Sequence, residues 1–396
     1  MRFLLLLLIP MVGSPLTSAK TVELGFPDLA HRVKVTLPDD YDPAKKYPAV
    51  FYYHGTGGKP DTSLMRSHVD GREWIVVGMT YYQQGKFTYT PESLEKEITL
   101  LLSVMRNLAE KRGLDQKRCY VAGFSKGGWI TDLLLQAEPS LAGGVILGAG
   151  HLYKAKPSGR AASRTRTQKP AGKPVFIGVG RLDGNFPFGL RAVVYHRSRG
   201  AQTTFESWQR LAHSFPKDGS TALQQWFSMR AHPSAKLNPV AKKEMESELD
   251  DALKLGNYDQ WMRLRQLKDY PYSQLLGDEW KRNLGDKIAA LESVAPVKIE
   301  AGFLSRHRKL LLREIKESTV LGMAKINIGF QDLIQKAPNA KQAELARHDH
   351  QRVQQLYLQF KEQDANKSDA KPKADDPFAP KDPERKRRIP MNPLVR

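Results

Sequence analysis

Apolar and polar positions along the chain repeat with two periods, and these periods distinguish strands from helices. Residues 33–37 alternate apolar and polar side chains, which is typical of a half-buried strand. The runs 47–53 and 143–147 are almost continuously apolar, as in strands that are covered on both faces of a sheet. The pattern therefore predicts a sheet with helices on both sides.

The helical pattern occurs between these strands. Residues 91–112 are amphipathic, with Thr90 as a suitable N-cap residue and Pro91 at the first helical position. Further strands are expected at 73–79, 120–122, 174–179 and 203–208, and further helices at 126–136, 188–198 and 221–230. Alternation at this spacing requires crossover connections, so it predicts an α/β fold with a mostly parallel sheet.

The pattern changes near residue 234. From there to residue 363 no strand is predicted, and the charged amphipathic segments are 239–255, 260–268, 279–291, 307–337 and 340–360. The remaining chain is polar, rich in proline and basic, which predicts disorder. We therefore expect an α/β domain (20–233), a helical C-terminal region (234–363) and a disordered basic tail (364–396). Every catalytic group considered below precedes Pro216, so the helical region is expected to be dispensable for the chemistry.

The first nineteen residues have the features of a signal peptide. Arg2 precedes an apolar run from Phe3 to Ile9, and small residues follow at 14–19. The apolar run is too short to span the roughly 30 Å of a bilayer core. The sequence therefore predicts export to the periplasm or the cell exterior. The single cysteine, Cys119, is expected to be buried in a strand.

The formal net charge of +20 predicts attraction to anionic surfaces such as the cell envelope. Basic residues cluster in a loop at 154–173, which contains no acid, and at 385–388. No zinc-finger spacing or RNA-recognition signature accompanies them, so no specific recognition of nucleic acid is expected. The basic loop follows the strand predicted beside residue 125, where it would favour anionic substrates.

The motif that suggests chemistry is Gly123-Phe-Ser125-Lys-Gly127, between a predicted strand and a predicted helix. A Gly-x-Ser-x-Gly sequence at such a turn is typical of a nucleophile elbow, where the backbone segments approach closely. The helix that follows would point its N–H groups and its dipole at Ser125. The same motif also occurs in ordinary turns, so the assignment depends on partner groups elsewhere in the chain.

A serine nucleophile needs a base, and the base needs a carboxylate that orients it. Asp183 follows the strand 174–179 in a glycine-containing loop, and His213 follows the strand 203–208. Both would lie at the strand-end edge that also carries Ser125. These three residues are the predicted catalytic set, in the chain order Ser, Asp, His.

The segment His54-Gly-Thr-Gly-Gly58 follows the strand 47–53 and predicts part of an oxyanion hole. The donors would be the backbone N–H of Thr56 or Gly57, together with that of Lys126. A phosphate-binding loop is the alternative use of such glycines, but the Gly-Lys-Ser/Thr ending of the nucleotide motif is missing.

Two further histidines are candidates for the substrate pocket. His54 opens the glycine-rich segment, and His151 follows the strand next to the predicted nucleophile strand. For His151, the alternative is a loop histidine without a role in the site.

These motifs resemble those of the α/β-hydrolase family, in particular secreted esterases related to feruloyl esterases and polyhydroxyalkanoate depolymerases. The resemblance covers residues 22–230 and rests on 54–58, 123–127, Asp183 and His213. It implies an α/β-hydrolase fold and a serine hydrolase that cleaves a carboxylic ester through an acyl-enzyme, without a metal or organic cofactor. The substrate would be a small-molecule or polysaccharide ester. The alternatives are a serine peptidase of the same fold and an inactive, hydrolase-like protein that binds the cell envelope.

Overall fold

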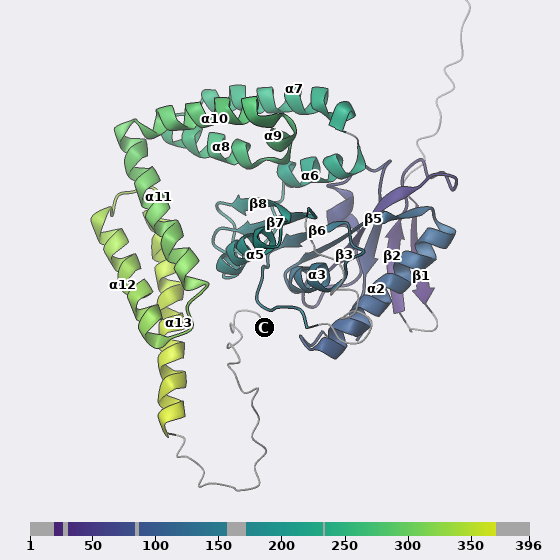
Figure 1. The fold of residues 1–396 in the computed structure, drawn as a ribbon, viewed down its shortest axis with the longest axis horizontal. Coiled ribbons are helices and arrows are strands. Elements are labelled where there is room, and N and C mark those ends of the chain that lie inside the picture. The colour runs from purple at the N-terminus through teal and green to yellow at the C-terminus, as the bar shows by residue number, and fades with distance from the viewer. Residues whose placement is uncertain (1–19, 27–30, 84–86, 157–171, 233, 370–396) are drawn as a thin grey trace, which may run out of the picture.

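The computed structural model describes residues 20–26, 31–83, 87–156, 172–232 and 234–369 (Figure 1). The predicted signal peptide, most of the predicted basic loop and the tail beyond residue 369 lie outside these residues. No helix of the described part is both long and apolar enough to cross a membrane.

The described strands form one eight-stranded sheet in the order β1-β2-β4-β3-β5-β6-β7-β8. The strands are β1 (Thr21–Phe26), β2 (His31–Thr36), β3 (Tyr47–Tyr53), β4 (Ile75–Met79), β5 (Leu114–Phe124), β6 (Gly143–Leu147), β7 (Pro174–Gly180) and β8 (Gln202–Trp208). β2 runs antiparallel to both β1 and β4, and all other neighbouring pairs are parallel. This order, with one antiparallel strand beside β4 and with β5, the strand before Ser125, in the middle, is that of the α/β-hydrolase fold, as predicted.

The two faces of the sheet have separate hydrophobic cores. In β3, Phe51 and Tyr53 pack into one core, whereas Val50 and Tyr52 pack into the other. Successive side chains of a strand point to opposite faces, so a strand buried on both sides is apolar at every position. Helices α2 (Pro91–Lys111) and α3 (Lys126–Ala137) cover the first face, and α1 (Ser63–Arg66) and α6 (Thr221–Ala231) cover the second.

Most of the predicted elements of this part are present. The strands predicted at 47–53 and 143–147 have the predicted bounds, and the Thr90 side chain caps α2 by accepting a hydrogen bond from the Ser93 N–H at 3.2 Å. Helix α5 (Phe186–Ser198) begins two residues earlier than predicted. The sequence analysis missed β1 and the four-residue helix α1, because neither segment is long enough for a clear period.

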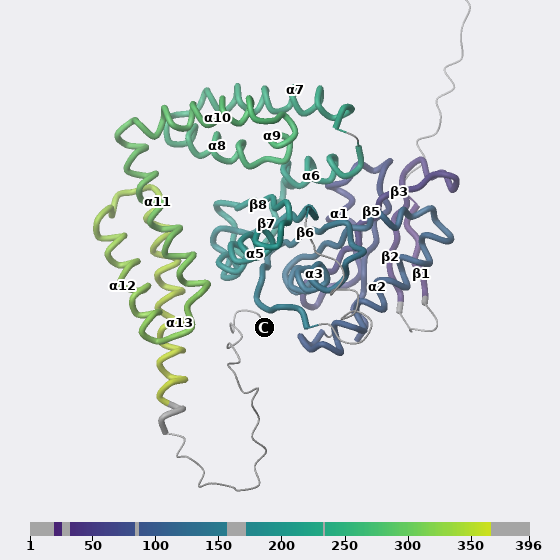
Figure 2. The backbone as a smooth tube through the Cα atoms, in the orientation of Figure 1, coloured from purple at the N-terminus to yellow at the C-terminus, as the bar shows by residue number. Residues whose placement is uncertain are grey.

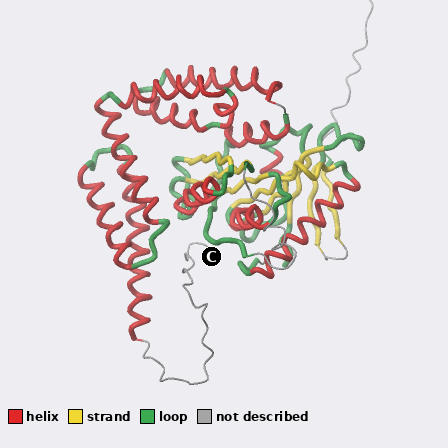
Figure 3. The backbone as a smooth tube through the Cα atoms, viewed as in Figure 1, coloured by secondary structure: helices red, strands yellow, loops and turns green. Residues whose placement is uncertain are grey.

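The C-terminal part of the described chain is entirely helical, and Figure 3 shows strands only in the other part of the molecule. Its helices are α7 (Ser234–Leu253), α8 (Asn257–Asp269), α9 (Pro271–Leu275), α10 (Gly277–Glu292), α11 (Ala295–Glu314), α12 (Val320–Lys336) and α13 (Ala343–Asp369). The path in Figure 2 runs from α6 through α7–α10 and then turns into α11–α13.

Three predictions for this region are wrong. The single helix expected at 307–337 is two helices, because Glu317 accepts hydrogen bonds from the Ser318 and Thr319 N–H groups and Thr319 caps α12. Helix α7 begins at Ser234, with Pro239 inside it rather than at its start. Helix α13 continues to Asp369, so its last turns lie within the segment predicted as a disordered tail.

The helical region shares both its cores with the sheet domain. Trp226 and Phe227 of α6 belong to one cluster with Met245 of α7 and Trp261 of α8. A second cluster joins the β7 and α5 side chains to α11, α12 and α13; its members include Val179, Phe186, Leu190, Phe303, Leu311, Met323, Phe330 and Val353. This packing argues against the expectation that the helical region can be removed without consequence, because its loss would expose buried apolar surface.

Candidate functional site

Ser125 lies at the tip of a sharp turn between β5 and α3. Its φ of 55° and ψ of −118° make it the only non-glycine residue with positive φ in the described chain. Such a conformation costs of the order of 1–3 kcal/mol for a residue with a side chain, and it persists where the surrounding packing enforces it. The strained serine between a strand and a helix is the geometry of a nucleophile elbow.

The glycines that flank Ser125 are required by close approach of the backbone. A Cβ atom on Gly123 would lie 2.2 Å from the carbonyl carbon and oxygen of Gly127. A Cβ atom on Gly127 would lie 2.0 Å from the carbonyl oxygen of Tyr53, at the end of β3. Any side chain at either position would therefore push α3 away from the sheet and move Ser125.

The structure brings Ser125, His213 and Asp183 together in a hydrogen-bonded chain. Ser125 Oγ lies 2.7 Å from His213 Nε2, and His213 Nδ1 lies 2.7 Å from Asp183 Oδ2. A carboxylate only accepts hydrogen bonds, so Nδ1 carries the proton and Nε2 is free to accept the serine proton. Asp183 follows β7 and His213 follows β8, so parallel strands place both groups at the edge where β5 ends.

Asp183 is held rigidly from several sides. It is only 3% exposed, its Oδ1 accepts a hydrogen bond from the Asn185 N–H at 2.8 Å, and its own N–H donates to the Gly180 carbonyl at 3.1 Å. The Asn185 side chain in turn donates to the Gly148 carbonyl at 2.9 Å. The carboxylate is therefore fixed before any substrate binds, which leaves Oδ2 directed at His213.

His213 is open to solvent, with 43% of its side chain exposed. The hydrogen bond to Asp183 raises the pKa of His213 above its ordinary value; partial burial opposes this shift, and the Asp183 charge adds to it. Its ring also lies 5.3 Å from that of Phe124. An accessible imidazole with one nitrogen on a carboxylate and the other on a hydroxyl is suited to general-base catalysis.

The predicted oxyanion segment lies against Ser125. A Cβ atom on Gly55 would be 3.5 Å from Ser125 Cβ, and the turn is closed by the Gly58 N–H, which donates to the Gly55 carbonyl at 3.2 Å. Within it, Thr56 is exposed and Gly57 has a positive φ of 74°. Lys126 is the first residue of α3, where N–H groups have no acceptor within the helix. The assignment of donors to Thr56 or Gly57 and to Lys126 stays a prediction.

The buried His54 stabilises this segment through hydrogen bonds. It is 8% exposed, and its Nδ1 donates to the Gly55 carbonyl at 2.7 Å, while the Tyr81 hydroxyl donates to the His54 carbonyl. Burial lowers the pKa of His54; the Gly55 hydrogen bond opposes the shift, and the charge of Lys126 adds to it. The described contacts of His54 thus fix the loop rather than line an open pocket.

His151 lies in a buried network that the sequence analysis did not predict. Its Nδ1 is 2.9 Å from Asp132 Oδ2, and the other carboxylate oxygen is 2.8 Å from His196 Nε2. The His151 ring stacks on Tyr195 with 3.7 Å between the ring centroids. Within the described residues, no hydrogen bond or ring contact of His151 reaches the triad. The described contacts tie His151 to Asp132 of α3, and its role as a pocket residue stays a prediction.

Glu97 is a second residue near the site that sequence reasoning missed. It lies on α2, is 1% exposed and accepts a hydrogen bond from the Tyr82 N–H at 3.0 Å. Burial raises its pKa to about 7; hydrogen bonds from Tyr82 and Tyr53 and the charge of Lys126 oppose this shift. The sequence contains a signal for it: Glu97 interrupts the apolar stripe of α2, and a carboxylate among core positions rarely lacks a role.

The charge of Lys126 acts on this buried carboxylate. Its Nζ lies 4.8 Å from the centroid of the Tyr81 ring. Burial lowers the pKa of Lys126, and the charge of Glu97 opposes that shift. The basic side chain next to Ser125 therefore lies over the Tyr81 ring.

A separate cavity lies elsewhere, lined by residues of α5, β8, α8 and α11. It has a volume of about 650 Å³, and no triad residue lines it. No group of three or more His, Cys, Asp or Glu in the described ranges is arranged to hold a metal ion. Of the predicted basic loop, residues 157–171 lie outside the described chain, and Lys173 donates to the Pro139 carbonyl at 2.8 Å.

Comparison with protein-family models gives no match, and comparison with curated proteins gives none either. Among solved structures, the chain is similar to a phospholipase/carboxylesterase from Dyadobacter fermentans (17% identity over 55% of this chain and 98% of that chain, TM-score 0.37). It is also similar to S-formylglutathione hydrolase from Staphylococcus aureus (14% identity over 54% of this chain and 96% of that chain, TM-score 0.40). A third similar structure is a ferulic acid esterase from Anaeromyces mucronatus (17% identity over 52% of this chain and 88% of that chain, TM-score 0.36). Similarity at this level identifies no substrate.

Proposed function

We propose that the protein is a serine hydrolase that cleaves a carboxylic ester, with Ser125 as nucleophile, His213 as general base and acid, and Asp183 as the orienting carboxylate. The single observation that carries the proposal is the continuous hydrogen-bonded chain of 2.7 Å and 2.7 Å from a strained elbow serine to a buried carboxylate. A structural serine has no need of a positive φ, and a structural histidine has no need of an exposed ring.

The reaction follows from the positions of these atoms. Ser125 Oγ attacks the ester carbonyl carbon while its proton moves to His213 Nε2, and the carbonyl oxygen becomes an oxyanion. Backbone N–H groups at the start of α3 and in the segment 54–58 stabilise that charge. Collapse breaks the carbon–oxygen bond, and His213 returns the proton to the leaving alcohol. Water then attacks the acyl-enzyme with His213 again as the base, which releases the acid and restores Ser125.

The ester is the preferred substrate class because the motifs at 54–58 and 123–127 resemble those of esterases. On one side, Ser125 is bounded by the 54–58 turn. The charged side chain of the next residue is the Lys126 ammonium, so esters with an anionic group are the first to test. A serine peptidase of the same fold is the enzymatic alternative. An inactive, envelope-binding protein is the other, and the intact hydrogen-bonded chain argues against it.

A substrate screen tests the proposal. The purified protein is assayed with short- and long-chain acyl esters, acetylated sugars, feruloyl esters and aminoacyl anilides, each beside Ser125→Ala. Hydrolysis of esters that is lost in Ser125→Ala supports the proposal. Cleavage of the anilides alone would favour the peptidase, and no turnover by folded protein would favour the binding protein.

Export is part of the same proposal and has its own test. The apolar run 3–9 and the small residues 14–19 suit signal peptidase. Expression of the full chain in a host with a secretory pathway should give a mature N-terminus near Lys20 by N-terminal sequencing. An intact Met1 in the cytosolic fraction would contradict it.

A further inference from the structure

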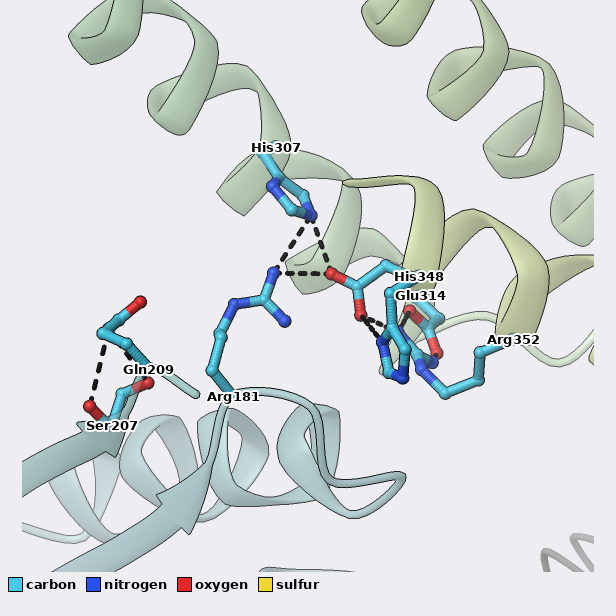
Figure 4. Close-up of polar contacts among 8 residues, drawn as sticks. Arg181, Ser207, Gln209, His307, Glu314, His348 and Arg352 are labelled. Carbon is cyan, nitrogen blue, oxygen red and sulfur yellow. Dashed lines mark hydrogen bonds and ion pairs between the residues drawn. The ribbon is translucent and has the colours of Figure 1, made fainter. Parts of the chain in front are cut away.

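A single side chain links the loop of the catalytic carboxylate to the C-terminal helices. Arg181 is the first residue after β7 and lies two positions before Asp183. Its guanidinium leaves the sheet domain and enters the space between α11 and α13, where Nη2 donates to Asp349 Oδ2 at 2.6 Å (Figure 4). Arg181 is 6% exposed and Asp349 is 1% exposed, so the contact is sealed from water.

The Arg181–Asp349 contact belongs to a larger buried network. His307 of α11 donates from Nε2 to Asp349 Oδ2 at 2.8 Å, and Arg352 donates to Asp349 Oδ1 at 3.0 Å (Figure 4). Arg352 also donates to both carboxylate oxygens of Glu314. Two arginines thus face two carboxylates, and the charges compensate each other where water does not reach.

The pKa directions fit this charge balance. Burial alone would raise the pKa of Asp349, but the hydrogen bond from His307, the neighbouring His348 and the charges of Arg181 and Arg352 hold it well below its ordinary value. For His307, burial and the two arginines lower the pKa, and Asp349 opposes the shift. Asp349 is therefore an anion and His307 a neutral donor near pH 7.

The chain between Arg181 and the catalytic carboxylate has little freedom. The Arg181 N–H donates to the Trp208 carbonyl and the Leu182 N–H donates to the Leu211 carbonyl, both at 2.9 Å. The Arg181 guanidinium also lies 4.3 Å over the ring of Phe186, at the start of α5. A shift of the Arg181 side chain therefore acts on a short, doubly anchored loop that carries Asp183.

The same network fixes where the helices dock. The apolar cluster that joins α5 to α11 buries surface, but apolar contacts do not favour one orientation of the helices. A buried ion pair forms only when its two charged groups meet, so it favours one alignment. Helices α5 and α11 contact each other beside it. Arg181 is the only sheet-domain residue with a described hydrogen bond to the network of Asp349, His307, Arg352 and Glu314.

We propose that Arg181 is a positioning residue, through which Asp349 and His307 of the C-terminal helices hold the Asp183 loop in register with His213. The proposal rests on the proposed function, since the position of Asp183 affects turnover only if the triad is used. It assigns the helical region a role in the chemistry although it contributes no atom to the triad.

Arg181→Met tests the proposal with two independent readouts. It leaves Asp349 the hydrogen bonds of His307 and Arg352, although Asp349 and Glu314 then share one arginine, so the folded state of the variant is checked first. We expect kcat for an activated ester to fall about 10- to 100-fold with KM unchanged, because displacements of about 1 Å at a distance have effects of this size. We also expect the proton resonance of His213 Nδ1–H, assigned by its loss in His213→Ala, to move upfield as the Asp183 hydrogen bond lengthens.

Three more variants complete the test. Arg181→Lys keeps the charge without the planar fork and should fall between Arg181→Met and wild type in both readouts. Arg181→Met combined with Asp349→Asn should have the kcat of Arg181→Met alone, because both changes break one contact. Arg263→Met is the matched control: its ion pair with Glu248 joins α7 and α8 within the helical region and does not touch the loop. It should leave kcat and the His213 resonance unchanged.

The outcomes separate the two proposals. Folded Arg181→Met with wild-type kcat and an unmoved His213 resonance overturns the positioning role, and so does additive loss in the double variant. If Arg181→Met does not fold, Arg181→Lys and the double variant decide by the same readouts. If the wild type cleaves no ester, the proposed function fails, but the resonance of His213 in wild type and Arg181→Met still tests the positioning.

Discussion

The strand-end edge of the sheet and its junction with α11 and α13 each contain an aspartate–histidine pair, and they differ in access. Asp183 and His213 lie 2.7 Å apart, and the histidine is exposed with its second nitrogen on Ser125. Asp349 and His307 lie 2.8 Å apart, and the histidine is 1% exposed. The pKa is raised in the first histidine and lowered in the second. An aspartate–histidine pair alone does not make the histidine a general base. The histidine must also be accessible to solvent, and its second nitrogen must face the group that gives up the proton.

A third aspartate, Asp132, contacts two buried histidines and extends this comparison. Asp132 lies between His151 and His196, so both carboxylate oxygens are occupied by imidazoles within the core. Such a pair ties α3 to α5 and to the loop after β6. We therefore expect substitutions at the strand-end edge to act on turnover and substitutions of Asp132 and its two histidine partners to act first on stability.

The largest expected effect is on turnover at the strand-end edge. Ser125→Ala and His213→Ala should each lower kcat by about 10⁴- to 10⁶-fold, and the double variant should lose little more, because neither group helps attack without the other. Steady-state kinetics on one activated ester measure this. A double variant much slower than either single variant would mean that the two residues act independently.

Asp183→Asn should have the next largest effect. The amide can hold the imidazole in place but favours the wrong tautomer, so kcat should fall by a factor on the order of 10⁴. The folded state should be retained, as circular dichroism and urea unfolding would show. Wild-type turnover in this variant would assign the orienting role to another carboxylate.

Asp132→Ala should show the opposite pattern. It leaves two buried imidazoles without their shared acceptor, so the free energy of unfolding should fall by about 3 kcal/mol. Turnover by the fraction that remains folded should stay close to that of wild type. Urea unfolding and kinetics at low temperature measure the two effects, and a folded but inactive variant would place this network in the active site after all.

The smallest effect is on the pH dependence. Only neutral His213 accepts the serine proton, so kcat/KM should fall as the pH drops through its pKa, which the Asp183 hydrogen bond raises above 6.5. The midpoint of the acid limb should therefore lie above pH 6.5 in wild type. Residual activity of Asp183→Asn should have its midpoint at lower pH. An unchanged midpoint in that variant would show that Asp183 does not set the pKa of His213.

The sequence was sufficient for most of the sheet and for the meeting of Ser125, Asp183 and His213 at one edge, because both follow from local patterns. Continuous apolar runs marked β3 and β6, and the Gly123–Gly127 motif marked the elbow. Chain order then placed Asp183 and His213 at strand ends of one parallel sheet. Such features depend on near neighbours in the chain and on the topology they imply.

What could not be predicted depends on contacts between distant segments. The buried contact between His151 and Asp132 was not predicted, because Asp132, on the preceding helix, gave no local signal for it. Arg181 and Asp349 are 168 residues apart in the chain, and nothing in the periodicity of α13 indicates that it packs on the loop after β7. The packing of the helical region on the sheet domain was missed for this reason.

The most direct measurement of the central claim is the site and rate of labelling by a fluorophosphonate probe. The intact chain is labelled, digested and analysed by mass spectrometry beside Ser125→Ala, His213→Ala and His196→Ala. We predict that the label is on Ser125 in wild type, absent in Ser125→Ala, far slower in His213→Ala and near the wild-type rate in folded His196→Ala. A folded wild-type protein that never takes up the label at Ser125, or equal rates in His213→Ala and wild type, would contradict the account.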